Sequence, residues 1–196
     1  MRLRTTAFAV LAIALSGDVA HAHDIVDGVG GFQGGFLHPL LVPAHTLSVL
    51  AFGLMSGQQD RPRVFLMALF PAALMATIAM IVAAMSLTIA QTLLLACGAA
   101  AGLLAALAQP MPRAVPAAIL ATGALSLIFD SVPSVVSKLD TLTALSGTAL
   151  AATLVFGLVA YATANLNRDW QRIGIRILGS WTAASALLVL ALRLAK

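Results

Sequence analysis

Two histidines, His38 and His45, stand seven residues apart at the start of an apolar run that continues to Gly57. Ionisable groups inside a membrane span are costly, so they usually face protein or water and mark a functional site. At about 100° per residue, seven residues make nearly two helical turns, so both rings would point from the same face. In a regular helix they would be roughly 10 Å apart along the axis, too far to bind one ion together.

Two prolines adjoin these histidines. Pro39 fits a first helical turn, whereas Pro43 lacks a backbone donor and would kink or unwind the helix around it. A broken helix could bring the two rings closer or free a carbonyl group to line a cavity. Imidazole nitrogens bind nickel, copper and zinc, so a broken helix would make this pair a candidate metal site.

The composition is that of an integral membrane protein. Of the 196 residues, 61% are hydrophobic and only 9% are charged, and none is glutamate. Soluble domains carry roughly a quarter charged residues. The net charge of +4 is small and reflects loop orientation, so we expect no nucleic-acid partner. The lone Cys97 has no disulfide partner in the chain, and we interpret it as a small packing residue.

The N-terminus is typical of a cleaved signal peptide, which we assign to residues 1–22. Arg2 and Arg4 precede a short apolar core, and Ala20-His21-Ala22 forms an A-x-A cleavage site. Cleavage would leave His23 at the new N-terminus outside the cytoplasm, where its amine and imidazole form a chelating pair. The alternative is that this histidine is only a polar residue beside a processing site.

Residues 23–35 form a polar, glycine-rich segment outside the cytoplasm for which we expect no packed element. From residue 36 onward the apolar runs divide into six candidate spans, each near the roughly 20 residues that a bilayer core requires. We therefore predict an all-α integral membrane protein, with residues 36–196 forming a six-transmembrane-helix bundle after the cleaved signal peptide. The predicted spans are about 36–56, 64–85, 88–108, 114–131, 142–164 and 173–194.

The positive charges predict the orientation of these spans. The second and fourth loops hold only Lys138 with two aspartates, whereas the arginines gather in the other loops. The positive-inside rule then places the first, third and fifth loops in the cytoplasm. Both ends of the mature chain would lie outside, in agreement with a cleaved signal peptide. The arginines of the odd loops are Arg61, Arg63, Arg113, Arg168 and Arg172.

Glycine pairs match the small-xxx-small pattern of closely packed membrane helices at Gly53 and Gly57, and at Gly98 and Gly102. We expect this packing to lie within one chain rather than between two copies. The sequence leaves the oligomeric state open.

The fourth predicted span carries a polar face, because Thr122, Ser126 and Asp130 recur every four residues. By the predicted topology, Asp130 lies at the outer end of its span, at the same depth as His38. It is the best-placed carboxylate to complete a site with the two histidines. The equal alternative is a solvated aspartate that caps the loop segment after it.

The run Gly34-Gly35-Phe36-Leu37-His38-Pro39-Leu40, followed by a second histidine at His45, resembles the HupE/UreJ family of bacterial membrane proteins. The run Arg172-Ile173-Gly174-Ile175-Arg176 also looks like the end of such sequences. The family is associated with hydrogenase and urease loci. The resemblance implies an inner-membrane permease or metal-handling protein for a divalent transition metal, nickel or cobalt first, with metalloenzyme maturation proteins as partners.

The family pattern places an aspartate directly before the second histidine, where this chain has Ala44. The resemblance implies His38 and His45 as ligands. His23 and Asp130, singled out above by their positions, are the candidate helpers. Two neutral imidazoles cancel none of a divalent ion's charge, so we expect Ala44→Asp to strengthen binding. We expect no tightly bound cofactor and, since no catalytic arrangement is visible, no enzymatic activity. The alternative is a non-transporting accessory or assembly protein whose histidines only hold helices together.

Overall fold

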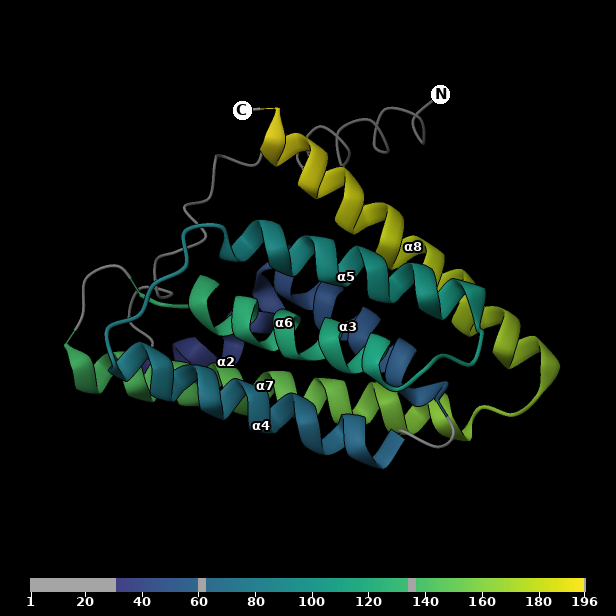
Figure 1. The fold of residues 1–196 in the computed structure, drawn as a ribbon, viewed down its shortest axis with the longest axis horizontal. Coiled ribbons are helices and arrows are strands. Elements are labelled where there is room, and N and C mark those ends of the chain that lie inside the picture. The colour runs from purple at the N-terminus through teal and green to yellow at the C-terminus, as the bar shows by residue number, and fades with distance from the viewer. Residues whose placement is uncertain (1–30, 60–62, 134–136, 196) are drawn as a thin grey trace, which may run out of the picture.

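A computed structural model describes residues 31–59, 63–133 and 137–195, which form seven α-helices and no strand (Figure 1). The predicted signal peptide and His23 lie outside these residues. The helices are α2 (Gly31–Leu41), α3 (Pro43–Gly57), α4 (Arg63–Val82), α5 (Ala90–Leu107), α6 (Ala114–Asp130), α7 (Lys138–Asn165) and α8 (Asp169–Leu194).

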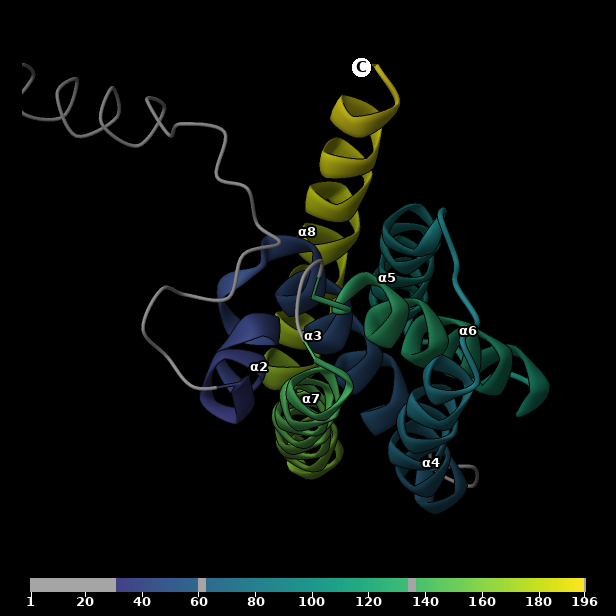
Figure 2. The same cartoon turned by 90° about the vertical axis from the view of Figure 1, so that its left-hand side faces the viewer.

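Helix α3 lies at the centre of the bundle. It contacts every other described helix, and 11 of its 15 residues are buried. Figure 2 shows the other helices arranged around it. A helix that is apolar on nearly all sides is suited to such a position, because each face can pack against a neighbour. The segment that carries His45 therefore lies inside the protein rather than against lipid.

A sharp break separates α2 from α3, whose axes differ by 71°. Val42, at the break, has an extended backbone, and Pro43 is the first residue of α3. Pro43 has no N–H to donate to the carbonyl of Pro39, four residues earlier. The hydroxyl of Thr46 lies 2.8 Å from that carbonyl oxygen and donates to it instead. The predicted break at Pro43 is confirmed, and Thr46 satisfies the acceptor that the proline leaves open.

Four of the described helices, α4, α5, α7 and α8, are long and apolar enough to cross a membrane. The broken pair α2–α3 makes a fifth if it is counted as one span. Helix α6 is apolar but has only 17 residues. Large side chains on the outer helices, such as Leu158, Trp181 and Leu188, are mostly exposed, as lipid contact requires. These observations establish an all-α membrane bundle, and the count of six spans stays a prediction that depends on α6.

The glycine pairs singled out in the sequence pack within the chain, as predicted. Gly53 and Gly57 lie against the backbone and side chains of α7. Gly98 lies against Ser48 of α3, and Gly102 lies against the backbone of α8. A methyl group at any of these positions would collide with the neighbouring helix, so the missing side chains set how closely the helices approach.

Residues 31–35 differ from the sequence-based expectation, because they are helical and packed rather than part of a connector. A Cβ atom at Gly35 would overlap the Ala144 carbonyl of α7, and the Thr148 hydroxyl donates to the Gly35 carbonyl oxygen at 2.9 Å. Glycine disfavours helix by about 1 kcal/mol per residue. Tertiary packing overrides that preference here, since only a surface without side chains can lie this close to α7.

Candidate metal-binding site

His45 and Asp130 form a buried pair between the first turn of α3 and the last residue of α6. The Nε2 atom of His45 lies 2.8 Å from an Oδ atom of Asp130. The histidine is completely buried, and the aspartate side chain is only 10% exposed. Phe52 follows His45 by seven residues on α3, and Gly123 precedes Asp130 by seven residues on α6. The Phe52 ring meets Gly123, so the two helices run antiparallel. This packing holds the pair together.

The ring of His38 lies beside that of His45. Their centroids are 4.8 Å apart and the ring planes meet at 69°, an edge-to-face contact. A regular helix would separate the two residues by roughly 10 Å along its axis. The break at Val42 brings the rings together, as the sequence predicted for a broken helix.

The partner of His45 determines which of its nitrogens is available. In the tautomer that donates from Nε2 to the Asp130 carboxylate, Nδ1 of the ring keeps a lone pair. Nδ1 is buried and has no hydrogen-bond partner within the described part of the chain. Leaving such an atom unpaired costs about 1–3 kcal/mol. Histidines that bind metals commonly donate their other N–H to a carboxylate, and His45 has this arrangement.

Asp130 is therefore placed to orient the ring of His45. Within residues 31–59, 63–133 and 137–195, no three His, Cys, Asp or Glu side chains form a group that could hold a metal ion. The structure brings together His38, His45 and Asp130, but the aspartate is bonded to a histidine rather than aimed at a shared point. His23, the other predicted helper, lies outside the described residues.

Ala44 does not face this pair. It is 3% exposed and lies in an apolar cluster with Val42, Leu95, Ala99 and Ala186. The new carboxylate of Ala44→Asp would enter apolar surroundings between α3, α5 and α8, which argues against the expectation that it would strengthen metal binding. In this chain the carboxylate beside the second histidine comes from α6.

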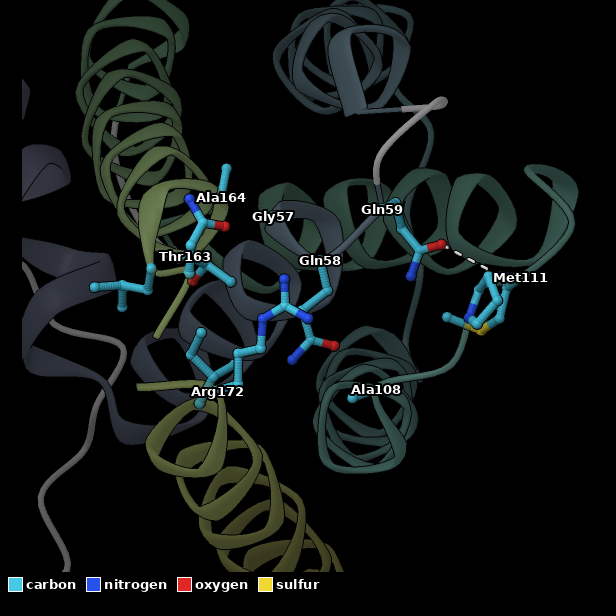
Figure 3. A pocket seen from close by; sticks show the side chains of 12 residues that line it. Gly57, Gln58, Gln59, Ala108, Met111, Thr163, Ala164 and Arg172 are labelled. Carbon is cyan, nitrogen blue, oxygen red and sulfur yellow. Dashed lines mark hydrogen bonds between the residues drawn. The ribbon is translucent and has the colours of Figure 1, made fainter. Parts of the chain in front are cut away.

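A second polar region lies at the other end of α3. A cavity of about 530 Å³ opens there among the ends of α3, α5 and α7 and the start of α8. Gln58 donates to the Ala105 carbonyl at 3.0 Å, and the Met111 amide donates to the side-chain oxygen of Gln59 at 3.3 Å. Figure 3 shows the Arg172 side chain extending into the cavity beside Gln58.

In the sequence, Gln58 and Gln59 stand between the first and second predicted spans, and neither was predicted to line a site. The sequence does contain a pattern that points to these glutamines, because Ser48 and Ser56 lie on the His45 side of α3 and Gln58 follows soon after them. The cavity is lined by residues of the first, third and fifth loops, the arginine-bearing loops of the predicted topology. It therefore lies at the opposite end of α3 from His45.

Comparison with known proteins adds one finding. The family described as HupE / UreJ protein matches residues 11–189. This range includes both histidines, Asp130 and all the described helices except the end of α8. No curated protein and no solved structure matches the chain. Because the family match extends over nearly the whole sequence, the chain belongs to the HupE/UreJ family.

Proposed function

We propose that this protein binds a divalent transition metal, nickel or cobalt, and carries it across the bacterial inner membrane. The observation that supports this most directly is the state of His45. Its Nε2 atom is held by Asp130 at 2.8 Å, and its Nδ1 atom is buried without a hydrogen-bond partner among the described residues. The ring is thereby oriented with one lone pair available for an ion.

The residues have different roles in this proposal. Nδ1 of His45 and the adjacent imidazole of His38 bind the ion, and His23 adds a ligand from the N-terminal segment. Asp130 orients His45 and places a negative charge close to the cation, the charge that Ala44 cannot supply. A transport site must bind strongly enough to admit the ion and weakly enough to release it. A site of few ligands suits an ion that is cargo rather than a permanent cofactor.

The proposed topology has six spans, with α2–α3 and α6 each counted as one. The mature chain begins at His23 outside the cytoplasm, so the histidine pair lies toward the periplasm and the cavity at Gln58 toward the cytoplasm. We further propose that the protein holds no permanent cofactor, is not an enzyme, and acts with the lipid bilayer, the metal ion and metalloenzyme maturation proteins as its partners.

Titration of the purified protein with Ni²⁺ and Co²⁺ tests the binding site. We expect binding by the native chain, loss of binding in His45→Ala, and affinity about 10–100-fold lower in Asp130→Asn, the usual effect of removing a carboxylate behind a metal-binding histidine. Thr77→Val is the matched control, because Thr77 is equally buried but lies on α4 and bonds only to its own helix. Equal affinity in all four proteins would contradict the proposal.

Transport needs a separate measurement. Cells grown under metal limitation should contain less nickel or cobalt when the gene is removed, and the native gene, but not the His45→Ala variant, should restore the content. An unchanged metal content would refute transport even if the purified protein binds metal.

One observation favours a second function, that of a non-transporting accessory protein. The His45–Asp130 pair is already a complete hydrogen bond between two helices, and such a bond stabilises a bundle in lipid. In this case His45→Ala would lower the melting temperature in detergent, and neither metal would raise that of the native chain. Under the transport proposal, the metal binds only the folded state and therefore raises the melting temperature of the native chain.

A further inference from the structure

Four buried side-chain atoms lack a hydrogen-bond partner in the described part of the chain. They are His45 Nδ1, Ser56 Oγ, Gln58 Oε1 and Ser126 Oγ. Buried polar groups are nearly always paired, and the exceptions require an explanation such as a water molecule or an ion. Three of these four atoms belong to α3 or to the residue after it, and the fourth belongs to α6.

Three of the four atoms, those of His45, Ser56 and Ser126, belong to α3 and α6, whereas Gln58 lies at the end of α3, bonds to Ala105 of α5 and lines the cavity. On α3, Phe52 and Ser56 each point within about 20° of His45, at 100° per residue. On α6, Ser126 lies between Asp130, which meets His45, and Gly123, which meets Phe52. From His45 to Gln58 the series extends roughly 20 Å along the helix, at 1.5 Å per residue. It begins at the candidate metal site and ends at the cavity.

We infer that this boundary between α3 and α6 is the route by which the ion crosses the bundle, with the cavity at Gln58 as its inner end. The inference rests on the proposed function. An ion that leaves water must find other oxygen or nitrogen atoms to replace part of its hydration shell. The unpaired hydroxyl oxygens along this boundary and the Gln58 amide oxygen at its inner end provide such atoms, together with the water molecules that they would hold.

An aromatic barrier divides this route. The Phe52 ring is completely buried, and its far edge lies so close to Gly123 that a Cβ atom there would overlap the ring. Phe70 lies behind it at 5.9 Å between centroids, and Phe156 lies 4.5 Å beyond Phe70. Apolar constrictions block ions by excluding water. Phe52 therefore separates an outer half, with His45 and Ser126, from an inner half, with Ser56 and Gln58.

The inner end of the route is suited to releasing the ion. The Arg172 side chain extends into the cavity beside Gln58, so a positive charge lies where the route opens (Figure 3). A like charge disfavours a resident cation. The ion would be held at the histidines and pass through the cavity without being retained there.

Accessibility of engineered cysteines tests the route without any metal. In a Cys97→Ala background, which removes the chain's single cysteine, Ser126→Cys and Ser56→Cys place a thiol on each side of Phe52. A small, positively charged, membrane-impermeant thiol reagent is added to vesicles of either orientation. We expect Ser126→Cys to react only from the Asp130 side and Ser56→Cys only from the Gln58 side. Thr77→Cys, buried on α4 with its native hydroxyl bonded within that helix, should stay unmodified from both sides.

Variants of Phe52 test the barrier separately. Adding Phe52→Ala should let Ser56→Cys react from both sides, whereas adding Phe156→Ala should not, because it removes a ring of equal size from α7 and leaves Phe52 over Gly123. If Phe52→Ala fails to fold, Phe52→Leu shortens the side chain while keeping the site apolar, and the same result is expected.

Two results would overturn the inference. The route is excluded if both serine-derived cysteines are as unreactive as Thr77→Cys in folded protein. The barrier at Phe52 is excluded if Ser56→Cys already reacts from both sides with Phe52 present, or if neither variant of Phe52 changes its reaction. A protein that shows the expected accessibility but takes up no metal would refute the proposed function instead, so the two failures are distinguishable.

Discussion

Among single residues, His45 and its neighbour Ala44 show how adjacent positions in one helical turn have opposite surroundings. His45 faces Asp130, whereas Ala44 faces Leu95, Ala99 and Ala186. Successive residues point about 100° apart around a helix, so a side chain at one position cannot take the place of a carboxylate at the other. In this chain the carboxylate beside the second histidine is that of Asp130 on α6.

Ala44→Asp should consequently destabilise the protein. Its carboxylate would be buried in apolar surroundings without a partner, an arrangement that typically costs about 3 kcal/mol or more. Thermal unfolding in detergent measures the change, and Ala44→Asn serves as the control because it adds the same volume without the charge. We expect a clearly lower melting temperature for the aspartate than for the asparagine. A tighter metal affinity in Ala44→Asp at unchanged stability would contradict this prediction.

Thr46 supports the break between α2 and α3 by donating to the Pro39 carbonyl. Replacing it with valine, which has the same shape, should cost about 1–2 kcal/mol because the Pro39 carbonyl loses the hydroxyl that donates to it. Thr46→Ser keeps the hydroxyl and should stay close to the native stability. The free energy of unfolding in detergent distinguishes the two variants, and equal losses would show that the hydroxyl is not needed.

At the scale of the helices, α7 illustrates how glycine sets packing distances. A Cβ atom at Gly147 would overlap the backbone carbonyl of Phe32 in α2, whereas one at Gly157, ten residues further along α7, would meet nothing within 4 Å. The two glycines therefore have different roles, although both lie in the interior of one helix. The first allows α2 to lie against α7, and the second has no packing role in the described chain.

Gly147→Ala should destabilise the protein by about 1–3 kcal/mol, because α2 must move or the helix must shift. Gly157→Ala should be neutral or stabilise it by up to about 1 kcal/mol, because alanine favours helix over glycine. The melting temperatures of the two variants should thus move in opposite directions. If Gly147→Ala were as stable as Gly157→Ala, the close approach of α2 and α7 would be incorrect.

For the whole molecule, the two polar regions lie at opposite ends of α3. The histidine pair involves the start of α3 and the end of α6, and the cavity involves the loops after α3, α5 and α7. The loops that bear most of the arginines meet at the cavity end. The positive-inside rule, applied to this arrangement, predicts that the cavity faces the cytoplasm.

Single cysteines test that orientation. In the Cys97→Ala background, Gln109→Cys in the exposed loop after α5 should react with an impermeant reagent only from the cytoplasm, and Ser137→Cys before α7 only from the periplasm. Reaction of both from one side would contradict the predicted topology, in which the single span α6 separates the two positions.

The processing of the N-terminus is a further prediction at this scale. The mature protein should begin at His23, with Arg2 and Arg4 removed. Mass spectrometry of the purified chain measures this directly. A mature protein that retains residues 1–22 would show an uncleaved first helix and would move His23 away from the chain terminus.

The sequence by itself determined the properties that depend on contiguous residues. Composition established the membrane class, because apolar content does not depend on how the helices meet. Pro43 predicted the break, because the missing N–H is a local property, and the approach of the two histidine rings was one of the two consequences expected of a break.

Tertiary structure decided what depends on residues far apart in the chain. Asp130 lies 85 residues from His45, and the sequence left it as either a partner or a loop residue. The burial of Ala44, the helical state of residues 31–35 and the cavity at Gln58 likewise depend on which helix packs against which. These contacts are set by the fit of surfaces, the glycine faces of α2, α5 and α7 above all, and that fit cannot be read from local hydropathy.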